Sequence, residues 1–229
     1  MKTVIDFLRL LKENNNRQWF NENKQLYLEA QARFNRYVEQ LLDIMKQGDD
    51  SLEGLQVKDC TYRIYRDVRF SQDKSPYKTH MGAYICPGGK KSGFAGYYFH
   101  IGVGGHGYPD GHMLAVGDYI CEPQVLKILR EDIQDYGQIF DDIVRNKADN
   151  NFMLDDSYKL KKVPKGFDKE SPWADYLKYK VFCLYQEPEE YLFTTNDSPN
   201  RVAQIMLSAK PFLNFINRAV SYVKEGNPS

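Results

Sequence analysis

The feature that most constrains the fold is a change in hydrophobic period that occurs twice along the chain. In the N-terminal part, apolar residues recur every three or four positions, which is typical of an amphipathic helix. That stripe consists of Leu26, Ala30, Phe34, Tyr37, Leu41 and Met45. In the middle of the chain apolar and polar residues alternate, which is typical of strands, and helical signals then return. We therefore expect an α+β fold, with a central, largely antiparallel sheet flanked by N-terminal and C-terminal helices.

The same pattern divides one expected domain, residues 1–229, into three parts. The parts are N-terminal helices over 3–46, a central sheet over 60–121 and a mostly helical C-terminal part over 122–224. No internal repeat and no linker rich in Gly, Ser or Pro separates them. The expected strands of the sheet are 61–70, 81–86, 94–101 and 113–121, and a short apolar strand at 179–185 lies between helices.

Two sequence signals predict where helices are interrupted. The run of asparagines at 14–16 should stop the first helix, because asparagine favours turns, and a second helix should begin near Asn21. The tail over 199–224 should form two helical pieces hinged at Pro211, because an interior proline removes a backbone donor.

A dense cluster of charge at residues 63–80 is the main candidate for function. It holds three arginines, two lysines, a histidine and two aspartates among aromatic residues. Between residues 60 and 91 there are seven lysines and arginines against two aspartates, a net charge of +5 in a chain of net charge zero. Such a cluster either binds an anion or forms an internal lattice of ion pairs.

If 61–70 is a strand, Arg63, Asp67 and Arg69 project from one face, on which successive residues lie ~7 Å apart. Arginine recognises carboxylate and phosphate through paired hydrogen bonds, so a phosphorylated or carboxylated small molecule is the first expected ligand. The candidate ligand-binding residues are Arg63, Arg66, Asp67, Arg69, Lys74, Tyr77 and Lys78. If the protein is an enzyme, which the sequence does not decide, His80 and His100 are the candidate acid–base residues.

Two other hypotheses remain open at this point. Asp67 and Asp73 would neutralise the arginines in a structural lattice, and the protein would then bind a partner elsewhere. Alternatively, basic residues among Tyr65, Phe70, Tyr77, Tyr97 and Phe99 would form a stacking platform for single-stranded nucleic acid. Nucleic acid is the weaker expectation, because the net charge is zero and the sequence pI is about 6.9.

The remaining motifs predict no cofactor and no metal. The stretch at 102–107 matches G-x-G-x-x-G, but Tyr108-Pro109 follows where a dinucleotide site needs a helix, so a loop is expected. His100, His106, Asp110 and His112 match no metal-ligand spacing. The four cysteines read as buried free thiols. The chain shows no signal peptide and no apolar stretch of membrane-spanning length, so we expect a cytoplasmic protein without a membrane partner; the sequence does not indicate its oligomeric state.

The spacing R-x-x-R-D-x-R-F-x-x-D-K-x-x-Y, which runs from Arg63 to Tyr77, resembles that of a bacterial and fungal family called domain of unknown function 2461. The stretches around 15–20, 88–93, 96–100 and 164–168 also resemble that family. The resemblance covers nearly the whole chain and implies one domain of about this length. It implies no activity, cofactor or catalytic residue, and His106 and His112 lie outside the family pattern.

Overall fold

The computed structural model describes residues 1–104, 111–148 and 151–226. The N-terminal helices are α1 (Lys2–Glu13), α2 (Arg17–Glu22), α3 (Lys24–Gly48) and α4 (Val57–Cys60), with a 3-10 turn η1 (Asp50–Leu52). The strands are β1 (His80–Ile85), β2 (Gly96–Gly102), β3 (Met113–Asp118), β4 (Met153–Leu154) and β5 (Phe182–Gln186). The later helices are α5 (Pro123–Ala148), η2 (Tyr176–Lys178), α6 (Tyr191–Thr194), α7 (Ser198–Ser208) and α8 (Lys210–Gly226).

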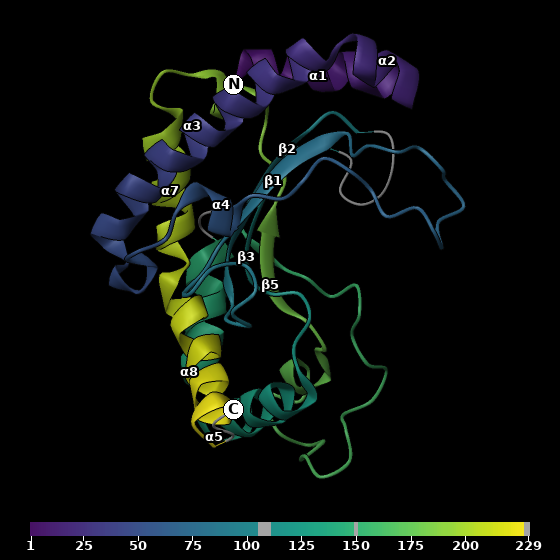
Figure 1. Ribbon diagram of the computed structural model, residues 1–229. Helices are drawn as coiled ribbons and strands as arrows, with labels where there is room; N and C mark the ends of the chain where they lie inside the picture. The colour runs from purple at the N-terminus through teal and green to yellow at the C-terminus, as the bar shows by residue number, and fades with distance from the viewer. Residues whose placement is uncertain (105–110, 149–150, 227–229) are drawn as a thin grey trace.

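The described residues form a five-stranded sheet with the strand order β1-β2-β3-β5-β4, in which every neighbouring pair is antiparallel. Helices lie at both ends of the chain, so the expected α+β fold is confirmed (Figure 1). The apolar strand expected at 179–185 is β5, and it is part of this sheet. The sheet therefore extends beyond the expected range of 60–121.

The helix boundaries follow local capping chemistry. The asparagine run ends α1, and the Asn16 side chain accepts the Trp19 N–H at 2.9 Å and caps α2, a short helix that was not expected. The helix expected from near Asn21 is α3, which begins at Lys24. The break between α7 and α8 falls at Ala209, which places Pro211 in the first turn of α8, where its missing N–H costs little. None of the helices in the described part of the chain is long and apolar enough to cross a membrane.

The segment 61–70 is not a strand, contrary to the expectation from its alternating pattern. It makes only isolated bridges, from Thr61 to Ala83 and from Tyr65 to Tyr77. The Arg66 N–H donates to the Pro76 carbonyl at 3.0 Å, but proline has no N–H to return, so the ladder cannot continue. The even positions Tyr62, Ile64, Val68 and Phe70 would have formed the mostly apolar face of this strand, and that expectation is also wrong, because the Phe70 side chain is 96% exposed.

One face of the sheet carries the core. Alternate residues of β1, β2, β3 and β5 face the core that includes α3, α7 and α8, which lie along one side of the sheet in Figure 1. These buried strand residues are Met81, Ala83, Ile85, Tyr97, Phe99, Ile101, Leu114, Val116, Phe182 and Leu184. Burial of a large apolar side chain contributes about 1.5–3 kcal/mol, so this face dominates the stability of the fold.

The opposite face of the sheet is hollowed rather than covered by these helices. It carries the other alternate residues, including Gly82, Tyr84, Tyr98, Met113 and Ala115, which line two adjoining hollows. We call it the open face. The long loop of residues 62–79 rises beside β1 at one end of this face, and we call it the arginine loop.

Candidate functional site

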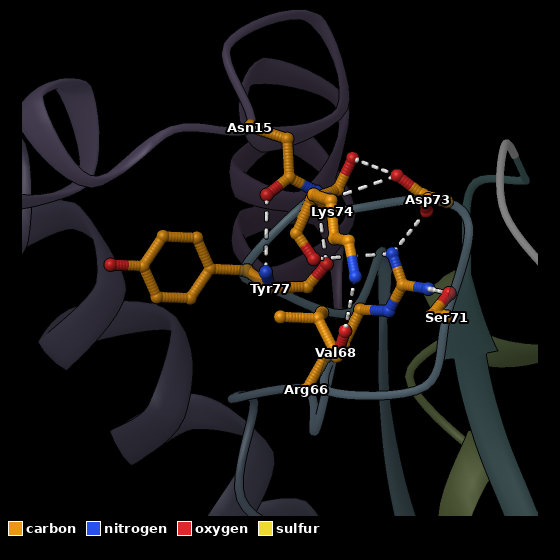
Figure 2. A network of polar contacts seen from close by, with 8 residues as sticks. Asn15, Arg66, Val68, Ser71, Asp73, Lys74 and Tyr77 are labelled. Atoms are coloured by element: carbon orange, nitrogen blue, oxygen red, sulfur yellow. Dashed lines mark hydrogen bonds and ion pairs between the residues drawn. The ribbon is translucent and has the colours of Figure 1, made fainter.

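The arginine loop is fastened to the N-terminal helices through Asn15 and Tyr77. The Asn15 side chain donates to the Tyr77 carbonyl at 2.9 Å and accepts the Tyr77 N–H at 3.1 Å, as Figure 2 shows. The Tyr77 ring stacks on Phe20, with ring centres 4.0 Å apart and planes inclined by 14°. Since Phe20 and Tyr77 are both buried, this contact anchors the loop where it turns back to β1.

Arg66 and Asp73 hold the tip of the arginine loop together through an ion pair and hydrogen bonds. Arg66 forms an ion pair with Asp73, and it also donates to the Ser75 carbonyl at 3.2 Å and the Ser71 hydroxyl at 3.4 Å (Figure 2). The Asp73 carboxylate accepts the Ser75 hydroxyl and N–H, and these bonds, followed by Arg66, hold the pKa of Asp73 well below its usual range. Lys74 donates to the Val68 carbonyl at 3.1 Å. These side chains therefore replace the missing strand ladder with bonds of their own.

Asp67 and Arg69 pair with each other on the outside of the loop. Arg69 Nη2 lies 2.6 Å from Asp67 Oδ2, and the Arg69 side chain is 76% exposed. The hydrogen bonds from Arg69 lower the pKa of Asp67. An exposed pair of this kind is screened by water, so it shapes the turn and adds little to the stability.

Arg63, Lys78 and His80 meet at a hollow on the open face. The hollow has a volume of about 260 Å³, and Tyr62, Gly82 and Tyr98 complete its lining. Arg63 and Lys78 have no ion pair with any residue that the structure describes. Burial lowers the pKa of Lys78, and the charge of Arg63 adds to that effect. Among the described residues, therefore, no carboxylate neutralises the two cations of this hollow.

His100 lies under this hollow with both ring nitrogens occupied. Its Nε2 is 2.8 Å from the Gly111 carbonyl, which only accepts, so Nε2 carries the proton. Its Nδ1 is then the acceptor for the Tyr98 hydroxyl at 3.0 Å. Burial, followed by the charge of His80, lowers the pKa of His100 to about 3. His100 is thus held neutral and orients Tyr98.

His80 is the histidine that faces the hollow. Its ring centre lies 4.8 Å from that of His100, and its ring nitrogens make no hydrogen bond to residues 1–104, 111–148 or 151–226. Burial, followed by the charges of Lys78 and Arg66, lowers the pKa of His80 to about 4. At neutral pH its ring therefore offers one N–H donor and one acceptor nitrogen, which suits proton transfer to or from a bound molecule.

The structure separates the predicted site residues into groups. Arg63, Lys78 and His80 come together at the hollow, while Arg66, Lys74 and Tyr77 hold the loop, Asp67 and Arg69 point outward, and His100 lies beneath. His106 and Asp110 fall outside the described residues. Within the described ranges, no three His, Cys, Asp or Glu residues are grouped so that they could hold a metal ion.

The sequence reasoning missed Tyr62, Gly82 and Tyr98 as lining residues. A signal for Tyr98 was present, because it stands two positions before His100 in β2 and therefore shares its face. The same rule relates Gly82 to His80 in β1. The thiols of Cys60, Cys86, Cys121 and Cys183 are free, as expected, although Cys121 is only partly buried.

Comparison with known proteins identifies the family of this chain. A family described as "Conserved hypothetical protein (DUF2461)" matches residues 3–215. Comparison with curated proteins and with solved structures found no match in either case. Because the family match spans most of the chain, the protein belongs to the domain of unknown function 2461 family.

Proposed function

We propose that the hollow between Arg63, Lys78 and His80 binds the phosphate or carboxylate group of a small molecule. The observation that carries this proposal is the pair of cations, Arg63 and Lys78, which line a hollow and have no carboxylate partner among the described residues. Two like charges held close together repel each other, so an anion placed between them relieves an unfavourable interaction as well as forming new bonds.

The lining offers the donors that such an anion needs. A guanidinium presents up to five N–H groups and an ammonium three, and the neutral His80 ring adds one more. Charge-assisted hydrogen bonds contribute about 1.5–3 kcal/mol each. The Tyr98 hydroxyl gives its proton to His100, so its oxygen remains an acceptor for a protonated group of the ligand. His80 is the residue that would exchange a proton with such a group.

Single-stranded nucleic acid fits this surface less well than a small molecule does. Tyr62 and Tyr98 have ring centres 6.5 Å apart and offer stacking surfaces near Lys78, which favours some contact with bases. A strand of phosphates, however, needs positive charge along its whole path. The adjoining part of the open face instead carries Asp118 and Glu122 at its rim.

Inorganic phosphate tests the proposal through the melting temperature. At about ten times its Kd, phosphate should stabilise the protein by about 1.4 kcal/mol, which corresponds to a rise of roughly 3–6 °C in Tm. Arg63→Gln should remove most of this rise, because it deletes a cation of the hollow. Arg69→Gln is the matched control, since Arg69 lies on the same loop but pairs with Asp67, and it should leave the rise unchanged.

Sodium chloride at the same ionic strength separates specific binding from screening. The proposal is wrong if chloride produces the same rise in Tm, or if the Arg63→Gln and Arg69→Gln proteins respond to phosphate alike.

A further inference from the structure

A second hollow, which we call the trough, opens directly beside the anion-binding hollow. Its volume is about 500 Å³, and the two share Tyr62 and Tyr98 as lining residues. Most of the trough surface is apolar. The residues that matter for its shape are Tyr62, Tyr84, Tyr98, Met113, Ala115 and Cys183. A volume of this size is in the range that holds one small molecule.

The register of the sheet explains why the trough is open. Across the strands Tyr98 stands opposite Ala115, and Gly96 stands opposite Gly117, so small residues alternate with large ones on this face. Gly117 has a φ of 138°, and a Cβ there would lie 2.1 Å from the Phe182 carbonyl, so no side chain can fill that position. The trough therefore stays open because the backbone at Gly117 leaves no room for a side chain.

Hydrogen bonds fix the aromatic walls. The Tyr84 hydroxyl donates to the carbonyls of Phe94 and Gly117, each at 3.1 Å, and the Tyr98 hydroxyl donates to His100. The ring faces of Tyr84 and Tyr98 are consequently held in place before any ligand arrives. Preorganised aromatic surfaces of this kind favour flat, apolar groups.

The charges around the trough determine which end takes an anion. Arg63, Lys78 and His80 lie at the end shared with the first hollow. Asp118 and Glu122 line the trough rim, where they disfavour a second anionic group, and the Lys90 ammonium there donates to the Lys58 carbonyl at 2.7 Å. The combined site is therefore cationic at one end and apolar over the rest of its length.

We propose that the natural ligand of this protein is an aryl phosphate or aryl carboxylate. Its anionic group binds between Arg63, Lys78 and His80, and its aromatic body lies in the trough against Tyr62, Tyr98 and Ala115. This inference rests on the proposed function, because it assigns the body of the same ligand whose anionic group the hollow binds.

Naphthyl phosphate, inorganic phosphate and the neutral naphthalenemethanol together test this inference by calorimetric titration. Naphthyl phosphate should bind on the order of 10- to 100-fold more tightly than phosphate, because its rings are removed from water in the trough. Naphthalenemethanol should bind much more weakly than naphthyl phosphate, because it lacks the anionic group that pairs with Arg63 and Lys78.

Two variants locate the rings. Ala115→Ile fills the trough floor and should bring the affinities for naphthyl phosphate and phosphate close together. Because a buried site can fail to accept a larger side chain, Ile120→Asp is the second variant: Ile120 is 83% exposed at the rim, so the fold tolerates the change. Ile120→Asp should lower the ratio of the affinity for naphthyl phosphate to that for phosphate by about threefold or more. Ile139→Asp makes the same substitution at an exposed site of α5 away from the trough, and it should leave both affinities as they are.

The outcomes distinguish the two proposals. Equal affinities for phosphate and naphthyl phosphate in the unaltered protein, with both lost in Arg63→Gln, overturn the assignment of the trough and leave the anion site standing. Tight naphthyl phosphate binding that Arg63→Gln does not change, together with no binding of phosphate, overturns the anion site and with it the ligand class. The placement of the rings is also overturned if Ile120→Asp and Ile139→Asp have the same effect on the ratio of the affinity for naphthyl phosphate to that for phosphate.

Discussion

Replacing Tyr77 by alanine should lower the free energy of unfolding by about 3–5 kcal/mol. The Tyr77 ring is buried, stacks on Phe20 at 4.0 Å and contacts Tyr65 with ring centres 5.4 Å apart. Its removal leaves a cavity at the junction of the N-terminal helices and the arginine loop, and Phe20 loses the partner on one of its faces. Chemical denaturation of the unaltered and variant proteins measures this difference.

Tyr77→Phe is the matched control for that prediction. It keeps the ring, and the Tyr77 hydroxyl makes no hydrogen bond to the part of the chain that the structure describes. The expected loss is therefore below about 1 kcal/mol. Similar losses for the alanine and phenylalanine variants would show that ring stacking does not hold the loop to α2.

Acidification should destabilise the fold, because His80 and His100 resist protonation while the chain is folded. Burial is the main cause, and it lowers the pKa of His80 from 6.5 to about 4 and that of His100 from 6.5 to about 3. In the unfolded chain both rings titrate near the ordinary value, so between pH 6.5 and pH 4 the unfolded state binds more protons. The free energy of unfolding therefore falls as the pH falls through this window, by roughly 3 kcal/mol or less for each histidine.

The contribution of His100 can be isolated by comparing how steeply the free energy of unfolding changes with pH in the unaltered protein and in a variant that lacks this histidine. Burial raises the pKa of Asp118 and Asp132, and these carboxyl groups act in the opposite sense, because the folded state takes up their protons first. The difference between the unaltered protein and His100→Gln cancels their effect. His100→Gln should be less stable at neutral pH and should lose less stability on acidification. Parallel curves of unfolding free energy against pH would contradict this assignment.

Periodicity predicted the sheet and its flanking helices but could not identify the arginine loop. β1, β2 and β3 were expected close to their observed bounds, because alternation with one apolar face is what a half-covered antiparallel strand requires. The segment 61–70 alternates too, yet its ladder is prevented by Pro76 and by side chains that bond to backbone carbonyls. Those bonds depend on the reversal of the chain between Tyr65 and Tyr77, which brings distant atoms together, so a local pattern does not reveal them.

The sequence predicted the charged residues of the candidate site but not the uncharged residues that line it. The local excess of cations pointed to Arg63 and Lys78, and His80 was a candidate acid–base residue because it ends the same cluster in the sequence. Which arginines would be neutralised depended on the geometry of the loop, where Arg66 meets Asp73 and Arg69 meets Asp67. Tyr62 lines the hollow from the arginine loop, and because this loop is not a strand, alternation in the sequence does not predict which way its side chains point.

The most direct test of the central claim is the pKa of the His80 imidazole, measured by NMR with and without sulfate. Sulfate is a suitable probe because it stays doubly charged across the range in which histidine titrates. An anion bound between Arg63, Lys78 and His80 favours the charged imidazolium, so sulfate should raise the pKa of His80 from about 4 by roughly one unit or more. His80→Gln assigns the resonance, and Arg69→Gln should show the same rise. An unchanged pKa of His80 at saturating sulfate, or an equal rise in Arg63→Gln, would contradict the proposal that this hollow binds the anion.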